Sequence, residues 1–317
     1  MPPRKPPGEW LEAQLSALLT LGEGLEVPIN GTFVAKPWTL LKLACLRYYV
    51  PIYLRILRNR YQRLAFIDLY SAAGASHYLQ ADSGLTIPGS SVIAAAGFDD
   101  GSGTPNRFDE LVAIDLSAEN LVTLARNVRP WGFEGGKNLF PIQSDSPKMA
   151  GAVGEHLSEK GGTHALVFAD SDRLEPSFDA LRAIVKGHDA VDLVILHLVS
   201  GAAMSNSREV LRRFYGCDPT EGFERESLSD LYVRQLERGL RPTVDEHPST
   251  IVEKVRVAGG SGMGGYCYDL DFAWRRTRGD SPFTGTIATL RSKVGQLDGD
   301  DVRHVISTIR GSQRKLG

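Results

Sequence analysis

Short apolar runs alternate with segments of helical periodicity through the middle of the chain. Five apolar runs rich in Val, Ile, Leu and Phe lie at 63–70, 109–117, 138–145, 164–172 and 190–199. Four segments long enough for two or three helical turns separate them, at 89–98, 118–128, 146–160 and 177–187. Strands that are apolar on both faces and alternate with helices belong to parallel sheets. The pattern therefore predicts an α/β fold in which helices cover both faces of a five-stranded parallel sheet.

Two further strands are expected near the C-terminus, within 249–277. The connection between them is glycine-rich and too short for a crossover helix, so they should pair as an antiparallel hairpin. A literal GxGxxG lies in this connection, but a dinucleotide site needs that motif between a strand and a helix. We interpret it as a hairpin tip. Five parallel strands plus such a hairpin resemble the Rossmann-like sheet of class I S-adenosylmethionine (SAM) dependent methyltransferases.

The region before the first strand has a helical pattern. We divide the chain into a disordered Pro-rich N-terminus at 1–8, an N-terminal helical extension at 9–62 and a methyltransferase-like α/β domain at 63–317. Residues 36–60 read as one long helix or a helix pair, which Pro51 should end or kink near Val50. Aromatic and basic side chains interleave there in a way that could suit nucleic acid, but a core-facing stripe with a solvated basic face is the simpler interpretation.

Composition narrows the class of protein. The 317 residues carry a formal net charge of −2, which gives no whole-protein attraction to nucleic acid or anionic lipid. Cys45, Cys217 and Cys267 are too far apart in sequence for a metal knuckle or a disulfide framework, so we expect reduced, buried thiols. Because no apolar segment has the length of a signal-peptide core or a membrane span, we expect a cytoplasmic protein without a membrane partner.

The first strand ends in a carboxylate followed by a turn of small residues. In open α/β sheets, ligands bind beyond the carboxyl ends of the strands, and small residues let a ligand approach backbone N–H groups closely. A purely structural turn would also use small residues. The candidate cofactor-binding residues here are Asp68, Tyr70, Ser71, Ala72, Ala73 and Gly74.

The second and third strands also end in acids. Asp115, followed by Leu116, lies where doubly wound sheets hold an acid that binds the ribose hydroxyls, although Asp115 could instead cap the next helix, as could Ser117. Asp145 and Ser146 lie where an adenine amino group would be, although Ser-Asp-Ser-Pro is also an ordinary helix start.

The fourth strand ends with two candidate catalytic residues, Asp170 and Asp172. They could orient a substrate or act as a base, or they could simply bond loop amides and Arg173. Acids at four consecutive strand ends favour an adenosine-type cofactor. No P-loop motif supports a nucleoside triphosphate, and no histidine motif supports a metal. We interpret His197 as a buried core residue.

Several segments resemble the three-Cys-motif partner protein family (TcmP), which has a SAM-methyltransferase-like fold. They are KPWTLLKLACLRYYVPIYLRI, FIDLYSAAGASHY, IPGSSVIAAA, FDELVAIDLSAENLVTLARNV and VFADSD. The family's first loop usually reads D-x-F-A-G-P-G, whereas this chain has alanines at Ala72 and Ala73. Its fourth strand usually ends near D-P-[FY]-G, whereas this chain has Asp-Ser-Asp-Arg from Asp170. The [DNS]-P-P-[FYW] motif of amino-methyltransferases is absent.

Three functions follow as hypotheses. The first is a SAM-dependent methyltransferase with an unidentified acceptor, in which positioning supplies much of the acceleration. The alternative is a non-catalytic or partner-dependent TcmP-type module, for which the resemblance implies a protein partner. The third is a nucleic-acid-processing component that uses Asp170 and Asp172 with a divalent metal, although the sequence offers no further ligand cluster beside these two acids. A nucleic-acid partner is possible, but the net charge does not support it.

Overall fold

A computed structural model describes most of the chain. The described residues are 5–28, 34–80, 83–99, 101, 105–205, 207–219, 225–244, 247–259, 266–277 and 281–316. The predicted GxGxxG tip at 260–265 lies outside them, as do residues 1–4 of the predicted disordered N-terminus.

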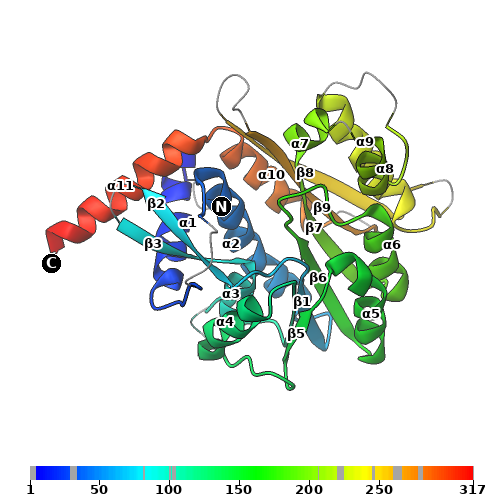
Figure 1. The fold of residues 1–317 in the computed structure, drawn as a ribbon, viewed down its shortest axis with the longest axis horizontal. Helices are drawn as coiled ribbons and strands as arrows, with labels where there is room; N and C mark the ends of the chain where they lie inside the picture. Colours follow the sequence, from blue (N-terminus) through cyan, green and yellow to red (C-terminus); the bar gives the residue numbers. More distant parts are fainter. Residues whose placement is uncertain are drawn as a thin grey trace.

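A seven-stranded sheet forms the centre of the molecule (Figure 1). Its strands are β1 (Arg63–Asp68), β4 (Glu110–Asp115), β5 (Leu139–Gln143), β6 (Thr163–Ala169), β7 (Val191–His197), β8 (Thr250–Gly259) and β9 (Tyr266–Arg275). The spatial order is β5-β4-β1-β6-β7-β9-β8, with the first five strands parallel and β9 antiparallel to both β7 and β8. The chain thus has the predicted class I methyltransferase-like α/β fold.

Helices cover both faces of the sheet (Figure 1). They are α1 (Pro7–Gly22), α2 (Pro37–Leu57), α3 (Ser90–Ala96), α4 (Ala118–Val128), α5 (Ser146–Glu159), α6 (Phe178–Gly187), α7 (Val199–Met204), α8 (Arg208–Tyr215), α9 (Arg225–Gly239), α10 (Thr284–Val294) and α11 (Gly299–Leu316), with a short 3-10 turn η1 (Arg129–Trp131). Alternate residues of β1 explain the two layers. Leu64 and Phe66 pack with α1 to α4, α10 and α11, while Ala65 and Ile67 pack with α5, α6, α8 and α9.

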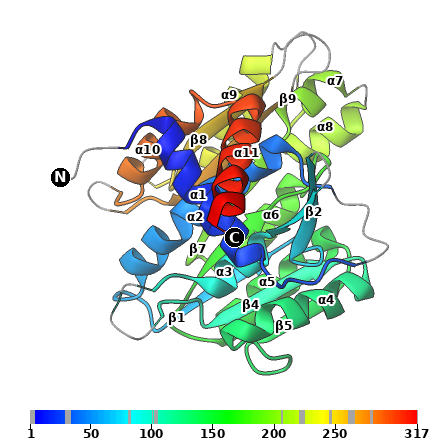
Figure 2. The same ribbon diagram turned by 90° about the vertical axis from the view of Figure 1, so that its left-hand side faces the viewer.

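A small hairpin that the sequence pattern did not predict follows β1. It consists of β2 (Ala75–Gln80) and β3 (Ser83–Pro88), which pair antiparallel as a separate sheet. The strand β3 packs against α1, and α1 in turn lies beside α11 (Figure 2). The hairpin therefore packs against the N-terminal helix and does not join the seven-stranded sheet.

The N-terminal helices differ from expectation in detail. The helix α2 runs through Pro51 to Leu57, so the proline does not end it. Proline costs a helix one backbone hydrogen bond, and the burial of Val50, Tyr53 and Leu54 around it offsets that loss. The helix α1 begins at Pro7, so residues 7 and 8 of the predicted disordered segment are helical.

Two other sequence expectations concern the cysteines and the membrane. Among the described residues no two cysteines form a disulfide, and only Cys45 is fully buried, whereas Cys217 and Cys267 are half-buried. In the part of the chain that the structure describes, no helix has both the length and the apolar character that crossing a membrane would require.

Candidate functional site

A cavity of about 380 Å³ opens at the carboxyl ends of β1, β4, β5 and β6. The chain leaves β1 toward β4 on one side and later returns to β6 on the other, so the cavity lies at a topological switch point of the sheet. Ten of the predicted site residues line it: Tyr70, Ser71, Ala72, Gly74, Asp115, Leu116, Asp145, Ser146, Asp170 and Asp172. Asp68 and Ala73 are buried beside it instead.

Asp68 connects the end of β1 to the start of α3. Its Oδ2 accepts hydrogen bonds from the hydroxyls of Ser90 at 2.6 Å and Ser91 at 2.7 Å, and the carboxyl group is fully buried. Burial raises the pKa of Asp68 to about 6, although the two serine hydroxyls oppose that shift. Asp68 therefore positions the loop and the helix from behind rather than facing a ligand.

The loop after β1 has an unusual backbone. Ala72 has φ = 46°, a left-handed conformation that costs a residue with a Cβ about 1–2 kcal/mol. Gly74 also has a positive φ, and a Cβ at that position would lie 2.5 Å from Leu124 Cδ1. The Asn127 side chain donates to the Ala73 carbonyl at 2.9 Å. The loop is thus held in one shape by its neighbours.

Asp115 reaches across to this loop from the end of β4. Its Oδ2 accepts from the backbone N–H of Ala72 at 3.0 Å, and its Oδ1 accepts from the Ser117 N–H at 2.8 Å and from Asn120 Nδ2 at 3.0 Å. The cap of α4 is Ser117, whose hydroxyl accepts from the Asn120 N–H. Next to Asp115, the Leu116 side chain is 74% exposed although it lines the cavity.

Asp145 and Ser146 lie at the start of α5. Asp145 is the N-cap residue, but its side chain makes no capping hydrogen bond. The Ser146 hydroxyl donates to the carbonyl of Leu69 at the end of β1. Ser146 therefore joins the β5 and β1 ends of the cavity, and Asp145 keeps its carboxylate half-exposed at the rim.

Asp170 and Asp172 lie at the other end of the cavity, after β6. Asp170 Oδ2 is 2.5 Å from the ammonium nitrogen of Lys42, which comes from α2. Burial raises the pKa of Asp172 above its ordinary value, Lys42 opposes that shift, and neighbouring Asp170 adds to it. The backbone N–H of Arg173 donates to the Ser171 hydroxyl at 3.1 Å.

Sequence reasoning missed the contribution of the N-terminal extension. Thr39 and Lys42, one turn apart on α2, both line the cavity. The signal was a single lysine inside an otherwise apolar run, flanked by Leu41 and Leu43, at a position that is 9% exposed. A lysine so nearly buried is rarely found without a partner.

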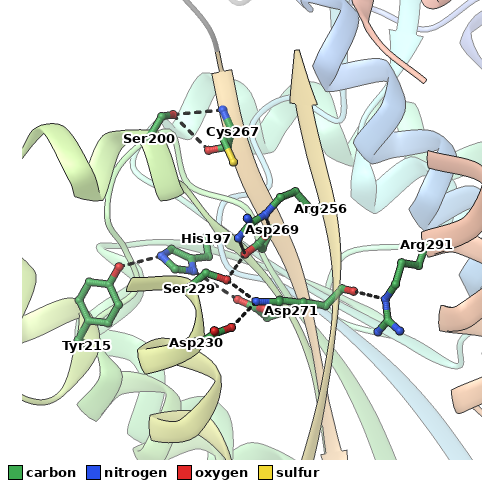
Figure 3. A network of polar contacts seen from close by, with 11 residues as sticks. His197, Ser200, Tyr215, Ser229, Asp230, Arg256, Cys267, Asp269, Asp271 and Arg291 are labelled. Atoms are coloured by element: carbon green, nitrogen blue, oxygen red, sulfur yellow. Dashed lines mark hydrogen bonds and ion pairs between the residues drawn. The ribbon is translucent and has the colours of Figure 1, made fainter. Parts of the chain in front are cut away.

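A second polar network lies outside the cavity, between the strands β7 and β9 and the helices α8 and α9 (Figure 3). His197, at the end of β7, is fully buried as predicted, and its Nε2 is 2.9 Å from the Tyr215 hydroxyl. Asp269 on β9 accepts two hydrogen bonds from the guanidinium of Arg256 and one from Ser229. These contacts fasten α8 and α9 to the antiparallel edge of the sheet. Among the described residues, no three His, Cys, Asp or Glu side chains group as metal ligands.

Solved structures similar to this chain include a Legionella pneumophila protein assigned to the family model DUF519. The two sequences are 10% identical, the match covers 78% of this chain and 89% of that chain, and the TM-score is 0.49. Trm1 from Pyrococcus horikoshii, in complex with S-adenosyl-L-methionine, has 10% identity, coverage of 89% and 78%, and a TM-score of 0.47. An O-methyltransferase from Bacillus cereus, in complex with SAH, has 11% identity, coverage of 87% and 93%, and a TM-score of 0.38. No protein-family model and no curated protein matches the chain.

Proposed function

We propose that this chain binds SAM in the cavity and transfers its methyl group to an acceptor. One observation carries the proposal: at the switch point of the sheet, Asp115 and the 74%-exposed Leu116 project into the same cavity. A carboxylate there can accept from a ribose hydroxyl, and an exposed apolar side chain beside it would be covered by a flat base. The volume of about 380 Å³ is within the usual range for small-molecule sites.

The residues present fit such a cofactor in a specific way. A carboxylate has about four acceptor positions, and Asp115 already uses three of them on Ala72, Ser117 and Asn120. We therefore expect Asp115 to accept from one ribose hydroxyl, through Oδ2, rather than from both. Asp145 would accept from the adenine amino group, and the loop from Tyr70 to Gly74 would lie along the amino-acid end.

The chemistry supplied by bound SAM is a methyl group on a positively charged sulfur. The chain would contribute positioning and a proton acceptor. Asp172 fits the second role, because it lines the cavity and burial raises its pKa above the ordinary value.

A partner-dependent TcmP-type module is the second candidate. The pairing of Asp170 with Lys42 favours it, because the ion pair occupies that carboxylate and leaves Asp172 alone as a proton acceptor. The resemblance of several sequence segments to the TcmP family also supports a partner-dependent module. A site completed only by a partner protein would bind SAM in isolation without turning it over.

Calorimetry with SAM and with S-adenosylhomocysteine (SAH) tests the proposal. We expect micromolar binding to the wild type, and a loss of about tenfold or more, or about 1.4 kcal/mol, in Asp115→Ala. The matched control is Glu119→Ala, an exposed acid on α4 that does not line the cavity and should leave binding unchanged. If the wild type binds neither compound, the chain has no cofactor site of its own. If the wild type does bind SAM, methyl transfer in an acceptor screen separates the enzyme from the partner-dependent module.

A further inference from the structure

The ion pair between Lys42 and Asp170 has more bonding capacity than it uses. Both residues line the cavity, and Lys42 is 9% exposed. The Oδ1 atom of Asp170 is buried and, among the described residues, has no hydrogen-bond partner. A lysine ammonium has three donors, and the contact with Asp170 occupies one. A buried ion pair compensates for its desolvation only when its remaining donors and acceptors are also satisfied.

The position of this pair within the cavity indicates which part of a ligand would reach it. Across the edge of the sheet the order is β5, β4, β1 and β6. Asp115 is the last residue of β4, Asp145 comes after β5, the loop from Tyr70 to Gly74 follows β1, and Asp170 follows β6. A ligand whose nucleoside end lies over β4 and β5 would therefore extend past the loop and present its far end to Lys42 and Asp170.

The far end of SAM is an α-amino acid, with a carboxylate and an ammonium on the same carbon. Such a zwitterion is complementary to a lysine and an aspartate held side by side, because each of its charges meets an opposite charge and no net charge is buried. If the ion pair between Lys42 and Asp170 only stabilised the fold, it would not need to face a cavity.

We propose that Lys42 and Asp170 together hold the amino-acid end of the cofactor, with Lys42 binding the carboxylate and Asp170 accepting from the ammonium. This inference depends on the proposed function, since it assumes that SAM is the ligand. It makes both groups positioning residues, and it replaces the predicted catalytic role of Asp170. It also makes helix α2, outside the parallel strands, part of the cofactor site.

Two ligands that share the nucleoside but differ at the other end test the proposal. We would measure binding of SAH and of 5′-methylthioadenosine, which lacks the amino-acid carbons, to the wild type, Lys42→Met and Asp170→Asn by calorimetry. Each substitution should weaken SAH by about tenfold or more, because each removes a charge-assisted hydrogen bond, and should change 5′-methylthioadenosine by less than about twofold. The matched control is Lys36→Met, which removes a positive charge from the start of the same helix and should affect neither ligand.

The other outcomes separate the two proposals. If a variant weakens both ligands equally, or neither, the pair is structural and this inference is wrong while the cofactor proposal stands. If the wild type binds neither ligand, the cofactor proposal itself fails, and this inference with it. If a variant does not fold, a measurement on the wild type still tests the proposal. Decarboxylated SAM, which lacks the carboxylate assigned to Lys42, should bind to the wild type about tenfold or more weakly than SAM. Equal affinities would overturn the role of Lys42.

Discussion

The backbone N–H of Ala72 donates a hydrogen bond to Asp115 Oδ2 at 3.0 Å. This contact joins the loop after β1 to the end of β4, and it forms while Ala72 has the left-handed φ of 46°. A residue with a Cβ is found in that conformation only when its surroundings impose it. Here Asp115 and the bond from Asn127 to Ala73 impose it, so strain in the loop is balanced by contacts that also shape the cavity.

Replacing Ala72 by glycine should stabilise the protein. Glycine removes the conformational strain of about 1–2 kcal/mol but costs about 0.5–1 kcal/mol of additional unfolded-state entropy. We expect a net gain of about 0.5–1 kcal/mol in the free energy of unfolding, measured in urea. The matched control is Ala73→Gly, a buried neighbour without a positive φ, which should lose stability. A loss in Ala72→Gly would contradict the strained conformation.

Leu116→Ala should weaken SAH without changing the stability of the ligand-free protein. The leucine side chain is mostly exposed in the cavity, so its truncation removes little packing until a base covers it. A lost contact of about 1 kcal/mol corresponds to about a fivefold rise in Kd. Val122→Ala on α4, which is also exposed but does not line the cavity, is the control. Unchanged affinity in Leu116→Ala would mean that no ring lies on this side chain.

The strand ends of the site could be predicted from the sequence, and the residues that come from elsewhere could not. Asp115 and Asp170 each follow an apolar run directly, Asp145 comes two residues after β5, and parallel strands bring such positions to one edge. Lys42 is close to Asp170 only because α2 packs on the sheet, which is a tertiary contact without a local signature.

Two further differences have the same physical origin. Asp68 was predicted to face the ligand, but the serines at the start of α3 provide two hydroxyls that draw its carboxylate inward. The hairpin of β2 and β3 was not predicted, because it is half-exposed, contains Gly84 and gains its packing from distant α1. Both contacts join residues that are far apart in sequence, so local sequence patterns do not predict them.

The pH dependence of stability should include a contribution from Asp68. Burial raises its folded-state pKa to about 6, so its favourable contribution is fully present below its ordinary pKa of 3.8 and is lost as the pH rises through about 6. A shift of that size corresponds to about 3 kcal/mol. In Asp68→Asn, this part of the decline in unfolding free energy between pH 4 and 7 should disappear. A variant with an unchanged pH profile would show that Asp68 does not titrate in this range.

Two acids on β9 should respond in opposite ways to the same substitution. Burial alone would raise the pKa of Asp269, but the hydrogen bonds from Arg256 and Ser229 lower it below the ordinary value. For Asp271, burial raises the pKa above the ordinary value. Asp269→Asn weakens a two-point bond to a guanidinium and should cost about 2–3 kcal/mol at neutral pH.

Asp271 has no such partner for its charge. Both of its carboxylate oxygens are buried and, among the described residues, neither has a hydrogen-bond partner, although His197 Nδ1 lies 3.7 Å from Oδ2. Because its folded-state pKa is raised, its ionisation weakens the fold as the pH rises, and Asp271→Asn should be at least as stable as the wild type at pH 8. Urea unfolding of both variants at pH 5 and pH 8 makes the comparison. If Asp271→Asn is the more damaged of the two at pH 8, then the pair of His197 and Asp271, rather than that of Arg256 and Asp269, holds α8 and α9 on the sheet.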